Sequence, residues 1–225
     1  MQNYDKKPDT YFAHARKAIA PLLPLGASKQ GAGARILEIG CGAGATLGWL
    51  RQSGTACEPI GVEIAEAAAS QARDFVDNVY CFDFERHDLP AGHGKFDIIL
   101  CLDVLEHMVD PWKVVDRLVS GYLKPGGTLV ISLPNIQHYS AVLPLLFRGR
   151  WRYENEGLLD RTHLRFFTQE SAAALLAHPR LKRVRSVTPG LGWRSRKGLF
   201  NALTGGVFAG LLIYQHYLAA VKRND

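Results

Sequence analysis

Three glycines at alternate positions are the feature of this chain most suggestive of chemistry. Gly40, Gly42 and Gly44 follow the apolar run 36–39 and precede residues that suit a helix. This pattern predicts a strand, a tight turn and a helix start, an arrangement that presents backbone N–H groups to a ligand. Glycine is needed because the turn demands unusual dihedral angles and because a Cβ would push the ligand away. Similar turns also join strands to helices without a ligand, so further evidence is needed.

Acidic residues supply that evidence, because they follow the predicted strands in order. Glu38 lies near the end of the first apolar run, and Glu63 lies about 20 residues beyond the turn, the spacing expected for an acid that accepts hydrogen bonds from ribose hydroxyls. Asp83 and Asp103 follow the third and fourth predicted strands. One such acid is often only a helix N-cap. Four in order predict a ligand site at the carboxyl ends of the strands.

The elements that position these acids alternate between strands and helices. We predict strands over 35–39, 59–64, 78–82, 96–102 and 128–133, and helices over 10–23, 43–53, 65–74 and 110–122. Residues 28–34 form a glycine-rich linker. The alternation predicts an α/β fold, doubly wound, with a mostly parallel sheet and helices on both faces.

Composition limits the class of protein. A chain of 225 residues, 47% of them hydrophobic, is expected to form one domain. The N-terminus lacks the apolar core of a signal peptide, so a cytoplasmic location is expected. Without CxxC spacing, the cysteines are expected to be buried free thiols in a reducing compartment, not disulfide or zinc ligands. They are Cys41, Cys57, Cys81 and Cys101.

Taken together, the motifs resemble those of class I S-adenosylmethionine-dependent methyltransferases. The matching pieces are Glu38–Gly44, Gly61–Glu63, Cys81–Asp83, Phe96–Ile99 with Asp103–His107, and Leu123–Gly127. The stretch Leu159–Thr168, with 133–135 and 149–151, resembles a bacterial branch often linked to cell-envelope glycans or small metabolites. The resemblance implies a seven-stranded sheet in the order 3-2-1-4-5-7-6, with strand 6 over 181–187 and an antiparallel strand 7.

The resemblance also implies which residues bind S-adenosylmethionine, a sulfonium cation with an amino acid tail. Glu38 would orient the amino group, Glu63 would accept the ribose hydroxyls, and Asp83 would face the adenine amino group. The backbone of Phe84 would lie nearby, and two carbonyls of the fourth strand would hold the ammonium group. The expected cofactor-binding residues are Glu38, Gly40, Gly42, Gly44, Glu63, Asp83, Phe84, Cys101, Leu102 and His107.

A nicotinamide dinucleotide is the main rival ligand, because Gly40, Gly42 and Ala45 also satisfy the G-x-G-x-x-A pattern. Glu38 would then place a negative charge close to a pyrophosphate. Asp83 and the run 103–107 would have no role in such a site. We therefore favour S-adenosylmethionine.

Methyl transfer requires the acceptor to be held about 3–3.5 Å from the donor carbon, on axis and away from water. A general base is needed only when the acceptor carries a proton, as a hydroxyl does. The candidates are His163 with Asp160, and His138 with Tyr139. A structural histidine bonded to Asp160 is an alternative role for His163.

The run Asp103-x-x-Glu106-His107 resembles the Glu-x-x-Glu-His run of quinone-type O-methyltransferases, whose acids and histidine can hold a divalent cation. Its first acid here is one methylene shorter. A cation site needs more converging ligands than this spacing guarantees, so no metal is expected.

Residues 135–167 are predicted to be an insertion that forms a substrate lid, since so long a connection in an α/β domain is usually functional. Positive charge gathers from here onward, because the segment 148–197 holds twelve Lys and Arg but four Asp and Glu residues, whereas the whole chain has a net charge of +6. Arginines with aromatic residues suit an anionic, phosphorylated or sugar-like acceptor. RNA stacking would use them too, but strand 4 lacks the Asp/Asn-Pro-Pro-aromatic run typical of nucleobase amino methyltransferases.

The segment 199–221 is open to two interpretations. It has no formal charge, it contains Gly206-x-x-x-Gly210, and its length would span a bilayer. Alternatively, it forms a helix over 198–211 and a final strand over 212–221, which completes the sheet. We favour the second interpretation, with peripheral membrane contact through 199–212 left open.

The sequence thus predicts one domain, with an N-terminal helix and linker (1–34), a cofactor-binding core (35–134), a substrate lid (135–167) and C-terminal helices and strands 6 and 7 (168–225). The expected function is S-adenosylmethionine-dependent methylation, by O-methylation of a small anionic or sugar-like acceptor. A nucleic-acid methyltransferase and a cofactor-binding regulator without turnover remain alternatives.

Overall fold

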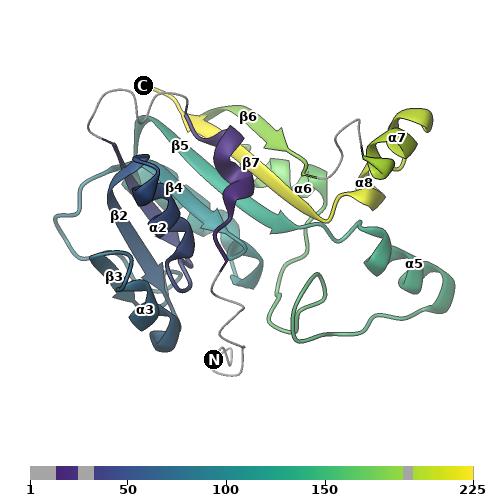
Figure 1. The fold of residues 1–225 in the computed structure, drawn as a ribbon, viewed down its shortest axis with the longest axis horizontal. Coiled ribbons are helices and arrows are strands. Elements are labelled where there is room, and N and C mark those ends of the chain that lie inside the picture. Colours follow the sequence, from purple (N-terminus) through teal and green to yellow (C-terminus); the bar gives the residue numbers. More distant parts are fainter. Residues whose placement is uncertain (1–13, 25–32, 190–194, 225) are drawn as a thin grey trace.

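The fold is built on one seven-stranded sheet with the order β3-β2-β1-β4-β5-β7-β6 (Figure 1). The computed structural model describes residues 14–24, 33–189 and 195–224. Strands β1 to β5 pair in parallel, whereas β7 is antiparallel to both β5 and β6. The predicted fold class and strand order are therefore confirmed. The strands are β1 (Ala34–Ile39), β2 (Ala56–Glu63), β3 (Asn78–Cys81), β4 (Phe96–Leu102), β5 (Leu123–Pro134), β6 (Leu181–Val187) and β7 (Gln215–Lys222).

Helices cover both faces of the sheet. The α-helices are α2 (Ala45–Gln52), α3 (Glu66–Ala72), α4 (Pro111–Arg117), α5 (Tyr139–Arg148), α6 (Gln169–Leu175), α7 (Arg196–Leu203) and α8 (Ala209–Leu212). Two 3₁₀ helices, η2 (Lys17–Leu22) and η3 (Leu105–His107), and one π-helix, η4 (Leu118–Tyr122), complete the set among the described residues. Figure 1 shows η2 and α2 on the near face of the sheet, with α6 behind it.

Alternating side chains of the central strands form two cores, as expected for a parallel sheet buried on both faces. On β4, Ile98 and Leu100 join the core beneath α2 and η2, whereas Ile99 and Cys101 join the core beneath α4 and α6. All four side chains are completely buried. These two cores fix the carboxyl ends of β1 and β4 side by side, with Ile39 opposite Cys101.

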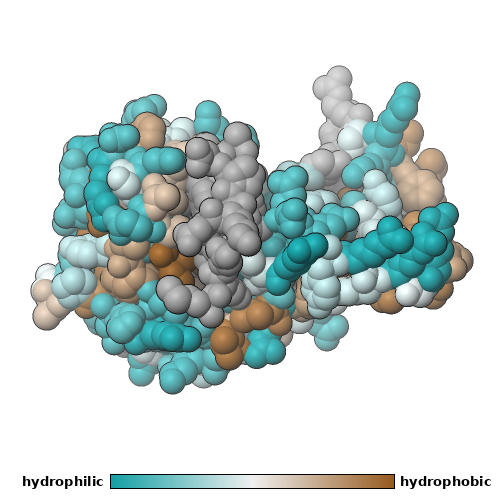
Figure 2. Space-filling model, turned by 90° about the horizontal axis from the view of Figure 1, so that it is seen from below, coloured by the Kyte–Doolittle hydropathy of each residue, from teal (hydrophilic) through white to brown (hydrophobic). Residues whose placement is uncertain are grey.

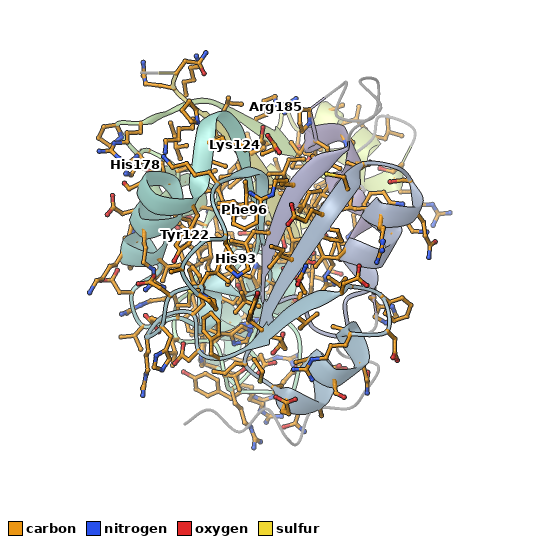
Figure 3. The ribbon with its side chains drawn as sticks, turned by 90° about the vertical axis from the view of Figure 1, so that its left-hand side faces the viewer. His93, Phe96, Tyr122, Lys124, His178 and Arg185 are labelled. Atoms are coloured by element: carbon orange, nitrogen blue, oxygen red, sulfur yellow. The ribbon has the colours of Figure 1, made fainter. Side chains whose placement is uncertain are left out.

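The opposite edge of the sheet, where the strands begin, is held by charge. Lys124 Nζ lies 2.8 Å from Asp97 Oδ1, and the Arg35 guanidinium carbon lies 5.2 Å from the centre of the Phe96 ring. Phe96, at the start of β4, pairs with Leu123, at the start of β5. The reader can find this edge in Figure 3 from the labels of Phe96 and Lys124. The polar residues of this edge have structural partners, which leaves the carboxyl edge as the place for a ligand.

The N-terminal helix predicted over 10–23 is wrong in type. The described part forms a 3₁₀ helix that begins at Lys17 and contains Pro21. Proline has no N–H to donate within an α-helix, and its ring clashes with the carbonyl four residues earlier. Residues 10–13 and most of the predicted linker, 25–32, lie outside the described residues.

The predicted helix over 198–211 is also wrong, because it is two helices separated by Gly205 and Gly206. Both glycines have positive φ angles, +61° and +82°, which end α7. Strand β7 then inserts between β5 and β6, so the bilayer-spanning interpretation of 199–221 is wrong as well. In the described part of the chain, none of the helices has the length and hydrophobicity that crossing a bilayer requires.

The prediction of buried cysteines holds for only two of the four. All four are free thiols, and Cys41 and Cys101 are buried as expected. Cys57 is exposed and Cys81 is half-buried, because Cys57 lies at the start of β2, where helices no longer cover the strand, and Cys81 ends the edge strand β3.

Candidate active site

The glycine turn between β1 and α2 has the backbone that its sequence predicted. Gly40, Gly42 and Gly44 have φ angles of +72°, +54° and +78°. A Cβ on Gly40 would lie 2.7 Å from a methyl carbon of Val104, in the segment that follows β4. The turn therefore needs glycine both for its dihedral angles and for its close contact with the neighbouring strand end.

Glu63 at the end of β2 fixes the shape of this turn. Its carboxylate accepts hydrogen bonds from the backbone N–H groups of Gly42, Ile64 and Ala65, at 2.9, 2.8 and 2.9 Å. Burial raises the pKa of Glu63, while these three hydrogen bonds lower it. The role predicted for Glu63, binding ribose hydroxyls, remains a prediction. The structure adds that Glu63 ties β2 to the glycine turn.

Glu38 tests most directly whether the site fits the expected cofactor. Its side chain is only 2% exposed, yet Oε2 has no hydrogen-bond partner among the described residues. Burial raises the pKa of Glu38 well above its usual value, although the positive charge of Arg16 opposes this effect. A buried carboxylate oxygen needs a donor, and the ammonium group of S-adenosylmethionine is a donor of suitable charge. The residues present therefore fit this cofactor.

Asp83 and Phe84 follow β3, at the adenine end of the predicted site. Asp83 remains partly exposed, accepts a hydrogen bond from the N–H of Glu85 at 2.9 Å, and lies 3.2 Å from the Arg86 guanidinium. The Phe84 ring is buried in the core, with the Arg117 guanidinium carbon 4.4 Å from its centre. Its carbonyl accepts a hydrogen bond from the same guanidinium. Asp83 thus has oxygens near solvent that an exocyclic amine can reach, while the ring of Phe84 is structural.

Arg16 is a site residue that the sequence did not reveal. Its guanidinium lies 2.8 Å from Asp103, and its backbone N–H donates to the Thr46 hydroxyl at 3.2 Å. It therefore connects the N-terminal segment to the first turn of α2 and to the residue that follows β4. No motif marks this position, because the partner acid lies 87 residues further along the chain.

Asp103 does not join Glu106 and His107 in the way that the sequence run suggested. It has a φ angle of +54°, the only positive value among the described residues other than glycine. Its carboxylate accepts hydrogen bonds from the Ser132 hydroxyl, at 2.8 Å, and from the Gln215 amide. Strained backbone of this kind is typical of functional sites. It directs Asp103 towards β5 and β7, while Cys101 and Leu102 are buried within β4.

The side chain that lies beside Glu106 is His163, which belongs to the lid segment (residues 135–167). His163 Nε2 lies 4.0 Å from Glu106 Oε1, and the rings of His163 and His107 meet edge to face with centres 4.8 Å apart. Glu106 is 1% exposed, and neither of its oxygens has a hydrogen-bond partner among the described residues. Burial, together with the charge of Asp103, raises the pKa of Glu106 well above its usual value. One potential ligand atom from each of Glu106, His107 and His163 lies within 4.8 Å of the others.

The lid segment is held against this cluster by its backbone. The N–H groups of Leu164 and Arg165 donate to the Glu106 carbonyl at 2.8 and 3.0 Å, and His107 Nδ1 lies 3.0 Å from the Thr162 carbonyl. At its two ends, Asn135 and Phe167 form a parallel bridge. Figure 1 shows the segment between α5 and α6 lying beyond the ends of β4 and β5. These backbone contacts therefore place the lid segment against the end of β4.

Asp160 and His163 lie in one turn of the lid segment, where the backbone N–H of His163 donates to the Asp160 carbonyl at 3.0 Å. The Asp160 carboxylate accepts hydrogen bonds from the N–H and hydroxyl of Thr162 at 2.9 and 2.7 Å, which shapes the lid turn. His163 Nδ1 lies 3.2 Å from the Leu158 carbonyl, which can only accept, so Nδ1–H donates in this contact.

His138 and Tyr139 belong to a different part of the lid, at the start of α5. The His138 side chain caps this helix through Ser140, and its ring centre lies 4.2 Å from that of Tyr139 and 5.2 Å from that of Tyr214. Burial, aided by the charge of Lys197, lowers the pKa of His138. A helix cap that packs against two aromatic rings has a structural reason for its position.

Comparison with known proteins identifies the family. Residues 11–178 match the family model described as a methyltransferase domain, so the chain belongs to this family of S-adenosylmethionine-dependent methyltransferases. The ubiquinone biosynthesis O-methyltransferase of Thiobacillus denitrificans is 31% identical over 120 residues, which cover 51% of this chain and 50% of the relative. The enzyme of the same name from Xanthomonas campestris pv. campestris is 33% identical over 106 residues, covering 46% and 44%. The chain thus spans about half the length of the curated relatives it matches.

Solved structures agree on the fold. An S-adenosylmethionine-dependent methyltransferase from Archaeoglobus fulgidus superposes with a TM-score of 0.63 at 19% identity, covering 95% of this chain and 97% of the other. The plantazolicin methyltransferase BpumL, solved with S-adenosylhomocysteine, gives a TM-score of 0.62 at 18% identity, covering 99% and 93%. Both are Rossmann-like folds of the methyltransferase type.

Proposed function

We propose that this protein transfers the methyl group of S-adenosylmethionine to a hydroxyl of a small anionic or sugar-like acceptor, with His163 as the general base. The observation that carries the proposal is the buried cluster of Glu106 and His163 at the end of β4. A buried carboxyl group beside an imidazole is suited to proton transfer, and the hydroxyl of a methyl acceptor needs a base in order to act as a nucleophile.

When bound, S-adenosylmethionine supplies a methyl group that is electrophilic because it is attached to a positively charged sulfur. The acceptor hydroxyl would lie between Nε2 of His163 and the Glu106 carboxyl group, whose 4.0 Å separation allows one oxygen to contact both. His163 would take the hydroxyl proton at Nε2, which would make the acceptor oxygen nucleophilic towards the methyl group that the bound cofactor supplies. Glu106 would then stabilise the imidazolium, and the carbonyl of Leu158 would continue to accept from Nδ1–H.

Further residues support the same assignment. Asp160 would act as a positioning residue, because its bonds to Thr162 set the turn that presents His163. Exposed arginines of the lid segment offer charge for a phosphate or carboxylate on the acceptor; they are Arg148, Arg150, Arg152 and Arg161. The name of the curated relatives, ubiquinone biosynthesis O-methyltransferase, describes oxygen methylation in those proteins and is consistent with a hydroxyl acceptor here.

The test combines acceptor discovery with two variants. Purified protein is incubated with S-adenosylmethionine labelled in its methyl group and with fractionated metabolite extracts, and labelled products are found by mass spectrometry. Mild alkali then distinguishes a methyl ether, which keeps the label, from a methyl ester, which loses it. A product that is an ester, or methylated RNA in place of a metabolite, would contradict the proposed acceptor.

With the acceptor in hand, His163→Ala is expected to lower turnover by about 10²- to 10⁴-fold, the usual contribution of a general base. Its affinity for S-adenosylhomocysteine should remain unchanged. The control is His178→Ala, which removes a histidine that is bonded to Asp116 on the surface, 3.0 Å away. Normal turnover by His163→Ala would refute the assignment. If a chelator abolished activity and one divalent cation restored it, the cluster would be a metal site and His163 would not be the general base.

A further inference from the structure

A cluster of exposed apolar side chains stands beyond the carboxyl edge of the sheet. Helix α5 and the segment from α7 to α8 lie at the same end of the molecule (Figure 1), and Figure 2 shows hydrophobic atoms at that end. Exposure is greatest for Leu146 and Phe147 on α5, at 70% and 75%, and for Leu203 and Val207 beside the Gly205-Gly206 break, at 78% each. We call these two segments, residues 139–152 and 195–208, the apolar end.

The two segments are held together at their bases. The Nζ atom of Lys197, in the first turn of α7, lies 5.8 Å from the centre of the Tyr139 ring, in the first turn of α5. The Asn135 amide donates to the carbonyls of Gly210 and Ile213 at 2.8 and 2.7 Å, which fixes α8 to the end of β5. The exposed apolar side chains are therefore presented by a built structure, formed by part of the lid segment and by the C-terminal helices packed against it.

Charge at the apolar end is of one sign. Residues 139–152 and 195–208 contain five basic residues and no acidic one; the basic residues are Arg148, Arg150, Arg152, Arg196 and Lys197. All five are exposed. Exposed leucine, valine and phenylalanine among arginine and lysine are typical of surfaces that lie in a membrane interface, where apolar side chains enter the acyl region and cations meet lipid phosphates.

A shallow hollow along one face of α5 fits the same partner. Four of its lining side chains are Tyr139, Leu143, Phe147 and Arg148. The hollow thus combines an apolar wall with one cation at the end of the helix. An acyl chain and its anionic headgroup have the corresponding chemistry.

We propose that the apolar end docks this protein on a bilayer that contains anionic lipid. The Gly205-Gly206 turn with Leu203 and Val207 inserts among the acyl chains, α5 lies along the interface, and the arginines contact lipid phosphates. This docking does not depend on the acceptor or on the base proposed above, and it is measured without turnover.

The experiment is flotation of the full chain with vesicles of phosphatidylcholine alone and with vesicles that also contain phosphatidylglycerol. Binding is expected to the anionic vesicles, to weaken as salt rises, and to be much weaker on the neutral ones. The variant Leu203→Ser/Val207→Ser should lower the vesicle partition coefficient by about tenfold or more, since two large apolar side chains no longer insert. The variant Arg150→Gln/Arg152→Gln should remove most of the preference for anionic lipid.

Matched controls are Val184→Ser, which alters an exposed valine on β6, and Arg180→Gln, which alters an exposed arginine just before β6. Both should bind vesicles like the wild type. All variants should keep the thermal unfolding midpoint and the S-adenosylhomocysteine affinity of the wild type, which separates docking from folding. Absence of vesicle binding, or equal binding by the Leu203/Val207 variant, would overturn the proposal. The proposal would also be overturned if the exposed side chains of the apolar end were buried in a dimer or in an RNA complex but not by vesicles.

Discussion

The variant Glu38→Gln isolates the electrostatic part of cofactor binding. Glu38 is buried, and its Oε2 has no hydrogen-bond partner among the described residues, so its carboxylate is available to an ammonium group. A hydrogen bond to a charged group contributes about 1.5–3 kcal/mol. Loss of that charge should therefore raise the Kd for S-adenosylhomocysteine by about 10- to 150-fold, because each 1.4 kcal/mol is about tenfold.

Isothermal titration calorimetry measures this Kd, and thermal unfolding of the ligand-free protein checks the fold. Since burial already raises the pKa of Glu38, a neutral glutamine should leave the ligand-free protein at least as stable as the wild type. The matched control is Glu58→Gln on neighbouring β2, an exposed acid paired with Arg35, which should leave the Kd unchanged. A Kd for Glu38→Gln within about twofold of the wild type, where at least tenfold is expected, would show that Glu38 does not contact the cofactor.

Three further predictions concern the site and the elements behind it. Gly42→Val should abolish cofactor binding in calorimetry, because Gly42 has a φ angle of +54° and a branched side chain would fill the turn. Gly61→Ala should lower stability in urea unfolding by about 1–3 kcal/mol, because the added Cβ would lie 2.6 Å from the Cys41 sulfur, whereas Gly121→Ala meets open space and should not destabilise. Burial raises the pKa of Glu106 above its usual value near 4.5, so the protonated form of Glu106 favours the folded state. This contribution to stability is complete below pH 4.5 and is lost as the pH rises through the higher pKa of the folded protein. The variant Glu106→Gln should therefore make the thermal unfolding midpoint less dependent on pH over that range.

The sheet and the cofactor edge were predictable because their signals are local. Each central strand is an apolar run, and the glycine turn and the acids Glu38 and Glu63 follow at fixed distances. Helix ends were less predictable, because tertiary packing sets where a helix stops. The break at Gly205 and Gly206 is an example, since glycine within an apolar stretch is compatible with a helix until its φ angle is known.

The cluster of Glu106, His107 and His163 was only partly predictable, because its members are distant in sequence. His163 was a candidate base from the sequence, but the approach of Glu106 to within 4.0 Å of it was not predictable, because Glu106 lies 57 residues earlier. Spacing alone suggested that Asp103, Glu106 and His107 act together. The positive φ angle of Asp103 directs its carboxylate to Ser132, which no sequence pattern indicates.

The central claim is that the glycine turn and the strand-end acids bind S-adenosylmethionine. Titration of the purified wild-type protein with S-adenosylhomocysteine in a calorimeter tests it most directly, with NADH as the competing ligand class. We expect saturable heat with S-adenosylhomocysteine and none with NADH. Saturable binding of NADH, with no heat from either S-adenosylmethionine or S-adenosylhomocysteine, would contradict it.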